Sequence, residues 1–297
     1  MASETNLELN DQAETIPARA AATVVLLRDA AGGMEVFMVK RHGLSDVLGG
    51  AHVFPGGKVD DADADPEALR RLGAPLDRLH AALCEPELAA TAAAGFFVAA
   101  CREMFEEAGV LLAEGATAQH VEAAQARALE GTGFGEMLTR LGLRLAWNDM
   151  VPWSRWITPR VPAMINKRFD ARFFLAAVPG GQEPRHDDYE ATESFWLRPR
   201  AVLEQFWAGE INLAPAQIMS MVALARHPCV ADALAAARAR RPPVIRPEPF
   251  KHEQGRAVAF PGDARHPVPE RALPGPSFLL YRNERFEPED GFEAFFV

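Results

Sequence analysis

The sequence is poor in the features that mark secreted, membrane-spanning and zinc-stapled proteins. Its 297 residues contain only three cysteines, Cys84, Cys101 and Cys229, and their scattered positions favour neither a disulfide framework nor a zinc site. No apolar run reaches the roughly 18 residues that a transmembrane helix needs, and residues 1–17 are polar and acidic, unlike a secretory signal. These absences predict a protein of the reducing cytoplasm that has no membrane partner.

An excess of positive charge is missing too. The formal net charge is −10, with 31 basic and 41 acidic residues, which argues against a nucleic-acid partner because such binding needs a basic surface. A small anionic substrate still fits, since a local cluster of cations and a bound metal ion can reverse the field. The chain also has no P-loop, no Gly-x-Ser-x-Gly elbow and no Cys-x-x-Cys pair.

The most informative stretch that is present runs from Arg102 to Val110. Glu103, Glu106 and Glu107 stand at i, i+3 and i+4 and therefore share one face of a predicted helix, which Gly109 would end. Three carboxylates on one turn repel each other, and a nearby cation would offset that cost. Carboxylate oxygens suit Mg²⁺ or Mn²⁺, although a solvated acidic helix face would explain the triplet taken alone.

A second stretch makes the pattern specific. Residues 102–110 fit the second half of the Nudix box, Arg-Glu-U-x-Glu-Glu-x-Gly-U with U aliphatic, and residues 54–58 (Phe-Pro-Gly-Gly-Lys) resemble its first half. Where the family has a glutamate five residues further on, this chain has the shorter acid Asp63, followed by a long insertion before Arg102. The split box and the phrase Gly-Ala-His-Val-Phe-Pro-Gly-Gly resemble the peroxisomal coenzyme A diphosphatase branch of the Nudix hydrolases.

This resemblance implies an α/β fold, a Nudix-type α/β/α sandwich with a mixed sheet. We expect a disordered tail over residues 1–18 and a Nudix hydrolase domain over 19–210, with the insertion at 64–95 inside the box. A helical and irregular C-terminal extension, 211–297, is expected to pack on that domain.

The resemblance also implies a chemistry. The expected reaction is metal-dependent hydrolysis of the diphosphate bond of a nucleoside diphosphate derivative, with coenzyme A or acyl-coenzyme A giving 3′,5′-ADP and (acyl-)4′-phosphopantetheine. Glu103, Glu106 and Glu107 would bind Mg²⁺ or Mn²⁺ together with a carbonyl of Gly57 or its neighbour, and Arg102 would orient the glutamates. Two alternatives stay open: a diphosphatase acting on ADP-ribose or NADH, and a non-catalytic Nudix-fold sensor, against which the complete glutamate set argues.

The remaining site residues are chosen from the loops. The catalytic base is expected in the loop before the closing strand, where we select Glu190 over Glu193 and His186. The partner is a small nucleoside diphosphate substrate, and a homodimer is left open. Four cations that flank predicted strands are candidates for binding the substrate: Lys40, Arg41, Lys167 and Arg168. Aromatic faces for stacking could come from Trp153, Trp156 and Phe169.

Hydrophobic periodicity predicts the order of elements. A β-hairpin over 21–40 leads into a short strand and a Pro-Gly-Gly turn at 52–57. Predicted helices cover 66–72, the chain from Pro86 towards Phe96 and on through the box, 117–141, 199–209, 215–226 and 230–240. Predicted strands cover 149–162 in part, 172–178 and 193–197. The segment from 242 to 276 is proline-rich and is expected to be irregular apart from a short strand at 257–260, and a last strand is predicted at 278–282.

Overall fold

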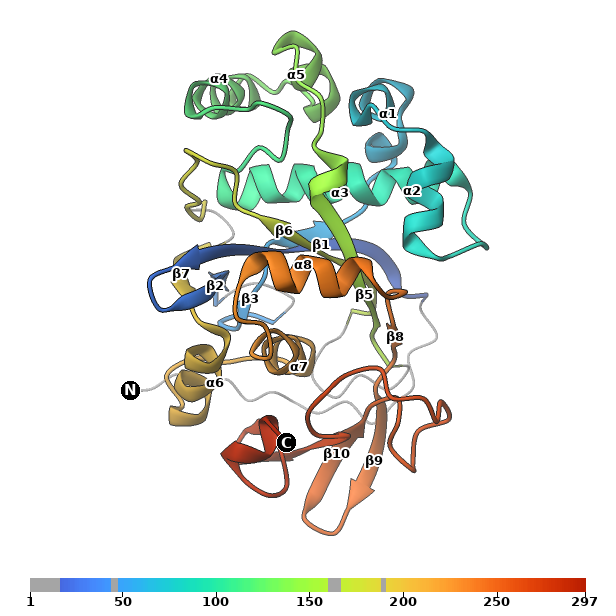
Figure 1. Cartoon of the computed structure of the whole chain (residues 1–297), viewed down its shortest axis with the longest axis vertical. Coiled ribbons are helices and arrows are strands. Elements are labelled where there is room, and N and C mark those ends of the chain that lie inside the picture. The colour runs from blue at the N-terminus through green and yellow to red at the C-terminus, as the bar shows by residue number, and fades with distance from the viewer. Residues whose placement is uncertain (1–16, 44–47, 160–166, 188–190) are drawn as a thin grey trace.

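A β-hairpin opens the described part of the chain, as predicted. The structure is a computed structural model that describes all residues except 1–16, 44–47, 160–166 and 188–190 (Figure 1), so the expected tail lies almost wholly outside the described residues. Strand β1 (Arg19–Ala30) pairs antiparallel with β2 (Gly33–Arg41), with Leu27 opposite Val36. The middle of β1 is fully buried, because helices cover both faces of the sheet to which it belongs.

That sheet has eight strands in the order β3-β2-β1-β6-β5-β8, with β4 paired to β1 and β7 paired to β2. Strand β6 runs parallel to β1, and β8 runs parallel to β5, whereas the other pairings are antiparallel. The sheet is therefore mixed, as predicted. Its further strands are β3 (His52–Val53), β4 (Gly56–Lys58), β5 (Met150–Ile157), β6 (Phe169–Ala177), β7 (Ala191–Leu197) and β8 (Val244–Ile245).

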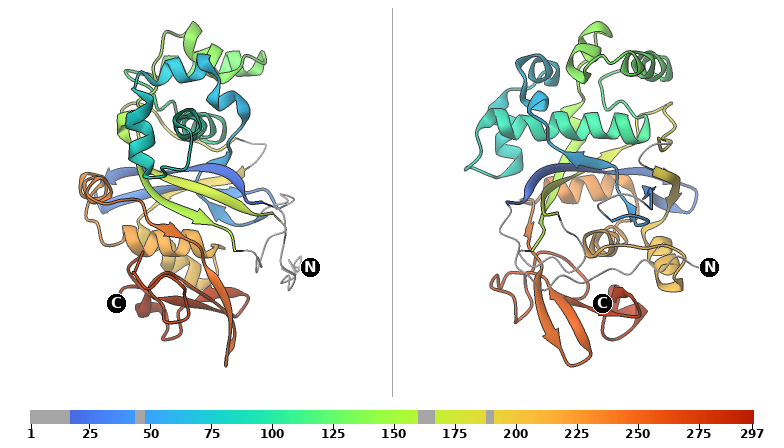
Figure 2. Two further views of the ribbon diagram at one scale, coloured as in Figure 1. Left: turned by 90° about the vertical axis from the view of Figure 1, so that its right-hand side faces the viewer. Right: turned by 180° about the vertical axis from the view of Figure 1, so that it is seen from behind.

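Helices form a layer on each face of this sheet, which confirms the α/β/α sandwich (Figure 2). One layer holds α1 (Pro66–Leu72), α2 (Leu76–Leu83), α3 (Ala90–Ala108), α4 (Ala118–Leu129) and α5 (Phe134–Arg140). The other holds α6 (Pro199–Ala208), α7 (Pro215–Leu224) and α8 (Val230–Arg238). Each layer packs its own hydrophobic core against the sheet.

Helix α3 is the centre of the first layer (Figure 1). Phe97 packs edge-on against Phe174 of β6, with ring centroids 5.0 Å apart, and Gly109 ends the helix in the left-handed conformation at φ 64°, as predicted. The helix starts at Ala90 and not at Pro86, and α2 was not predicted. The expected helix over 117–141 is divided into α4 and α5, because Gly131 turns the chain at φ 79°.

The C-terminal segment carries more regular structure than its prolines suggested. Strands β9 (Glu248–His252), β10 (Gly255–Ala259), β11 (Phe278–Arg282) and β12 (Arg285–Glu287) form an antiparallel sheet in the order β12-β11-β10-β9. The expectation of an irregular chain is therefore corrected over β8 and β9. Pro249 is tolerated because β9 is an edge strand, where a missing N–H removes no inner ladder bond.

Two further observations concern the cysteines and the apolar character of the helices. All three cysteines are free thiols, and burial raises the pKa of Cys101, with the charge of Asp63 acting in the same direction. Among the described residues, no helix combines the length and the apolar character that crossing a bilayer requires.

A buried ionic cluster joins the insertion to the sheet. Glu85, between α2 and α3, accepts hydrogen bonds from both nitrogens of the Arg172 fork and lies 2.7 Å from Arg155 Nη1. Arg155 in turn pairs with Asp170 at 2.8 and 2.7 Å, and Arg172 stacks over the ring of Phe96. Although burial would raise the pKa of Asp170, the two arginines hold it below its usual value.

This cluster predicts that Glu85→Gln lowers the free energy of unfolding by about 3 kcal/mol, because removing the Glu85 charge leaves the buried Arg172 to share the carboxylate of Asp170 with Arg155. Chemical denaturation followed by circular dichroism measures the change. The matched control is Glu87→Gln, since Glu87 pairs with Arg155 from a side chain that is 60% exposed and should change stability little. Equal effects of the two substitutions would contradict a structural role for the buried pair.

Candidate active site

The two glycines of the Pro-Gly-Gly phrase lie against the glutamate helix. Where the sequence suggested a tight turn, Gly56 and Gly57 form strand β4 on the edge of β1. A Cβ at Gly56 would approach Ala22 O to 2.4 Å, and one at Gly57 would meet the Glu103 carboxylate at 2.5 Å. Gly56, at φ 154°, therefore requires glycine, because backbone atoms occupy the space of a side chain. At Gly57 a side chain would have to displace the Glu103 carboxylate.

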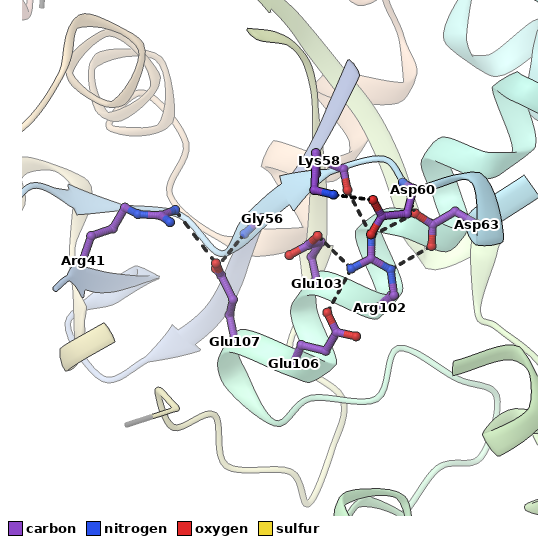
Figure 3. A network of polar contacts seen from close by, with 9 residues as sticks. All are labelled: Arg41, Gly56, Lys58, Asp60, Asp63, Arg102, Glu103, Glu106 and Glu107. Atoms are coloured by element: carbon purple, nitrogen blue, oxygen red, sulfur yellow. Dashed lines mark hydrogen bonds and ion pairs between the residues drawn. The ribbon is translucent and has the colours of Figure 1, made fainter. Parts of the chain in front are cut away.

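Arg102 is the hub of the site (Figure 3). Its Nε and Nη2 donate to the two carboxylate oxygens of Asp63, each at 2.8 Å. Its Nη1 donates to Glu103 at 2.8 Å and to Glu106 at 2.9 Å, and Nη2 also reaches the carbonyl of Lys58 at 3.0 Å. Although burial alone would lower the pKa of Arg102, its bonds to Asp63 and the charge of Glu103 raise it.

Asp63 ties the two halves of the split box together. Only 2% of this residue is exposed, and it stands in a short 3₁₀ helix, Asp61–Ala64. Besides its fork to Arg102, its Oδ2 accepts the backbone N–H of Asp60 at 2.8 Å. The shorter acid thus holds the arginine, and through it the glutamates, in a fixed position. The two halves of the box therefore remain in contact although the insertion separates them in the sequence.

The three glutamates differ in their surroundings. Glu107 is buried, accepts the N–H of Gly56 at 2.9 Å and lies 4.0 Å from Arg41. Glu103 is buried beside Gly57. The Glu106 side chain is 51% exposed, and desolvation by its neighbours raises the pKa of its carboxyl, against the opposing effect of Arg102. Two of the carboxylates thus face β4, and the third faces outward.

A cavity of about 460 Å³ opens beside these groups, within the range of small-molecule sites. Glu103, Glu107, Gly56 and Gly57 line it at one end. Four basic residues line it as well: Arg19, Arg41, Lys58 and Lys167. An anionic substrate would find in this cavity the cations that the overall charge of the chain does not supply.

The structure separates the cations that the sequence grouped. Arg41 and Lys167 line the cavity, whereas Lys40 lies outside its lining and pairs with Glu193 at 3.4 Å. Arg168 lies outside the cavity lining and donates to the carbonyls of Thr158 and Pro159, which are structural contacts. Glu190, the predicted base, lies outside the described residues.

Two cavity cations were missed from the sequence. Lys58 directly follows the Pro-Gly-Gly phrase, and this adjacency was a usable signal. Arg19 carried no such signal, because its place depends on the parallel pairing of Arg19 with Phe169 across β1 and β6. Of the aromatic candidates, Trp156 and Phe169 line the cavity, and Trp153 is buried in the second core without lining it.

Comparisons with known proteins agree with this geometry. A family model described as NUDT19 Nudix domain matches residues 85–224. The chain is 29% identical over 265 residues to acyl-coenzyme A diphosphatase NUDT19 of Gallus gallus, covering 72% of this chain and 70% of that protein. It is 30% identical to the Homo sapiens protein of that name, covering 68% of this chain and 63% of the relative.

A solved structure adds the fold. The crystal structure of a NUDIX hydrolase from Alicyclobacillus acidocaldarius superposes with a TM-score of 0.58 at 26% identity, covering 77% of this chain and 99% of that one. Sequence and fold together indicate a Nudix hydrolase. Enzymes of this superfamily cleave diphosphate bonds and generally need a divalent metal ion.

The Nudix glutamates fit such an ion in donor chemistry, since carboxylate and carbonyl oxygens are the ligands that hard cations prefer. Within the described parts of the chain, however, no three His, Cys, Asp or Glu side chains converge as a preformed metal cluster. Arg102 and the Gly56 N–H take up oxygens of all three glutamates instead. A bound cation would compete with these contacts for the same oxygens.

The Arg102 hub predicts that Asp63→Asn lowers turnover by about tenfold to a hundredfold, the usual cost of losing a group that orients ligands. Stability should fall as well, because a buried fork to Arg102 is broken. Steady-state kinetics on a diphosphate substrate and thermal unfolding measure the two effects. Asp60→Asn is the control, because Asp60 is more exposed and lies 3.8 Å from Arg102. This substitution should change turnover and stability much less. A fully active Asp63→Asn would show that Arg102 does not depend on this acid.

Proposed function

We propose that this Nudix hydrolase cleaves the diphosphate bond of coenzyme A or acyl-coenzyme A, giving 3′,5′-ADP and (acyl-)4′-phosphopantetheine. The observation that carries the proposal is the placing of buried glutamates and four cations around one cavity. The similarity to acyl-coenzyme A diphosphatases of two vertebrates supports the substrate class. Water adds across the P–O–P bond: its oxygen joins one phosphorus, and the other phosphate leaves with the bridging oxygen.

The proposed roles follow from position. Glu103, Glu106 and Glu107, with a carbonyl of Gly56 or Gly57, would hold Mg²⁺ or Mn²⁺. When bound, such an ion stabilises the negative charge that develops on the phosphates. Arg102 keeps the glutamates oriented, and the cations Arg41 and Lys58 lie where phosphate oxygens would approach the helix.

The proposed base is Glu190, and the described chain leading towards it supports this choice. The backbone N–H of Arg185 donates to Ala108 O at 3.0 Å, and that of Asp187 donates to Glu107 O at 3.2 Å. The loop that precedes Glu190 is therefore fastened to the end of the glutamate helix. His186 is engaged with Ser194 at 2.8 Å, which makes it the weaker candidate.

We also propose that the protein acts in a reducing compartment such as the cytoplasm. Its three free cysteines support this location. Two alternatives define the test of function: a general diphosphatase that prefers ADP-ribose or NADH, and a sensor that binds without hydrolysis. A hydrolysis screen of coenzyme A, acyl-coenzyme A, ADP-ribose and NADH with each metal separates the three.

Glu106→Gln tests metal-dependent catalysis. The substitution keeps size and hydrogen bonding but removes one charge from the ligand set, so turnover should fall on the order of a hundredfold. Stability should be unchanged or higher, because the raised pKa of Glu106 means that its charged form is disfavoured in the folded protein. Steady-state kinetics with Mg²⁺ measure turnover, and thermal unfolding without metal measures stability. Near-normal turnover would place the metal elsewhere.

Recognition of the 3′-phosphate tests the substrate. Coenzyme A carries this group and 3′-dephospho-coenzyme A does not, and a charged hydrogen bond to it is worth about tenfold to a hundredfold in catalytic efficiency. We expect coenzyme A to be the better substrate and Lys167→Gln to narrow the difference. Lys40→Gln is the matched control, because Lys40 lies outside the cavity lining. Equal efficiency on both forms, with ADP-ribose faster, would overturn the substrate assignment.

A further inference from the structure

The cavity beside the glutamates has two chemically distinct walls. Its charged lining residues come from the Nudix strands, the glutamate helix and the chain before β6. Further along, the lining is aromatic and aliphatic: Trp156 and Phe173 project from β5 and β6 on the face of the sheet that is opposite to α3. One cavity thus joins a charged region to an apolar region.

The C-terminal segment closes the apolar region. From the start of α7 onward it contributes Ala216 and Gln217, and from the second sheet and its approach it contributes Pro247, Val258 and Phe286. None of these residues is charged, although the segment from residue 211 to 297 is rich in arginine and glutamate. Its charges are thus kept away from the cavity, which fits an uncharged portion of a ligand.

Two polar atoms in this wall lack partners. Trp156 Nε1, a donor, and Gln217 Oε1, an acceptor, are buried and make no hydrogen bond to any residue that the structure describes. Both side chains line the cavity. An unpaired buried polar group costs free energy, and a purely hydrocarbon ligand would leave both atoms without a hydrogen-bond partner. A ligand with secondary amides offers one acceptor and one donor in each amide, which matches this pair.

We infer that the C-terminal segment forms a binding site for the uncharged, amide-containing acyl arm of the substrate. This inference rests on the proposed function, which places the diphosphate at the glutamates. An acyl-pantetheine arm then extends from the charged region into the apolar region, where its amides face Trp156 and Gln217 and its acyl chain meets Val258 and Phe286. The C-terminal segment is then part of the substrate site, and it discriminates among substrates by the arm attached to the diphosphate.

The test uses S-octanoylpantetheine, which has the arm but no diphosphate and therefore cannot be hydrolysed at one. Calorimetry on the full chain should detect its binding, and it should compete with octanoyl-coenzyme A in the hydrolysis assay. Ala216→Phe places a ring at the cavity wall and should weaken binding of this probe by about tenfold or more, since single methylenes already change pocket affinity on that scale.

The control is matched in position. Ala216 is the second residue of α7, and Ala231 is the second residue of α8, exposed and outside the cavity lining. Ala231→Phe should leave probe binding unchanged. Equal binding by Ala216→Phe and Ala231→Phe would overturn the assignment, as would hydrolysis of octanoyl-coenzyme A by a wild-type protein that does not bind the probe. If the probe binds and no coenzyme A derivative is hydrolysed, the proposed function fails and the binding site stands.

Gln217→Leu separates the amide contact from the apolar wall. Losing a neutral hydrogen bond should lower the affinity for S-octanoylpantetheine by several-fold to about tenfold. Binding of octan-1-ol, which has no amide, should not weaken, and the melting temperature of the free protein should rise because an unpaired buried carbonyl is removed. Unchanged affinity for the probe in Gln217→Leu would remove the amide contact from the proposal.

Discussion

The fork between Arg102 and Asp63 is the contact on which the rest of the site depends. The guanidinium uses two nitrogens for Asp63 and a third for Glu103 and Glu106, so it is bonded to both halves of a motif that the insertion divides. Because Arg102 is largely buried, its charge would destabilise the folded protein if these partners were missing. The two ends of the insertion must therefore lie close to the Arg102–Asp63 contact. The length of its helices can change only where this contact is not disturbed.

The same principle, a charge held by several partners, fastens the insertion at its other end. Glu85 lies between Arg155 and Arg172 on the sheet, just before α3 begins. The glutamate helix is therefore fixed from both sides: by the Asp63 junction and by the Glu85 cluster that precedes it. This rigidity matters because carboxylates that bind a cation must keep their positions against mutual repulsion.

The second face of the sheet carries a different task. There the α6–α8 layer and the C-terminal sheet enclose one end of the cavity that begins at the glutamates. A C-terminal segment that supplies a wall can change which substrates fit without altering the glutamate helix. A charged region and an apolar wall in one cavity are a physical route by which a shared motif can serve different diphosphates.

The sequence by itself determined the local features: the β-hairpin, the end of α3 at Gly109, the glutamate face and the Nudix class, because each is encoded within a few residues of chain. It did not determine α2 or strand β9. Nor did it determine that Arg19 lines the cavity and that Arg168 does not. Those depend on tertiary contacts: Pro249 fits a strand only because that strand is at an edge, and Arg19 lines the cavity only because β1 pairs in parallel with β6. Short-range patterns carry no record of which distant strand becomes a neighbour, so only the folded chain decides which charges meet.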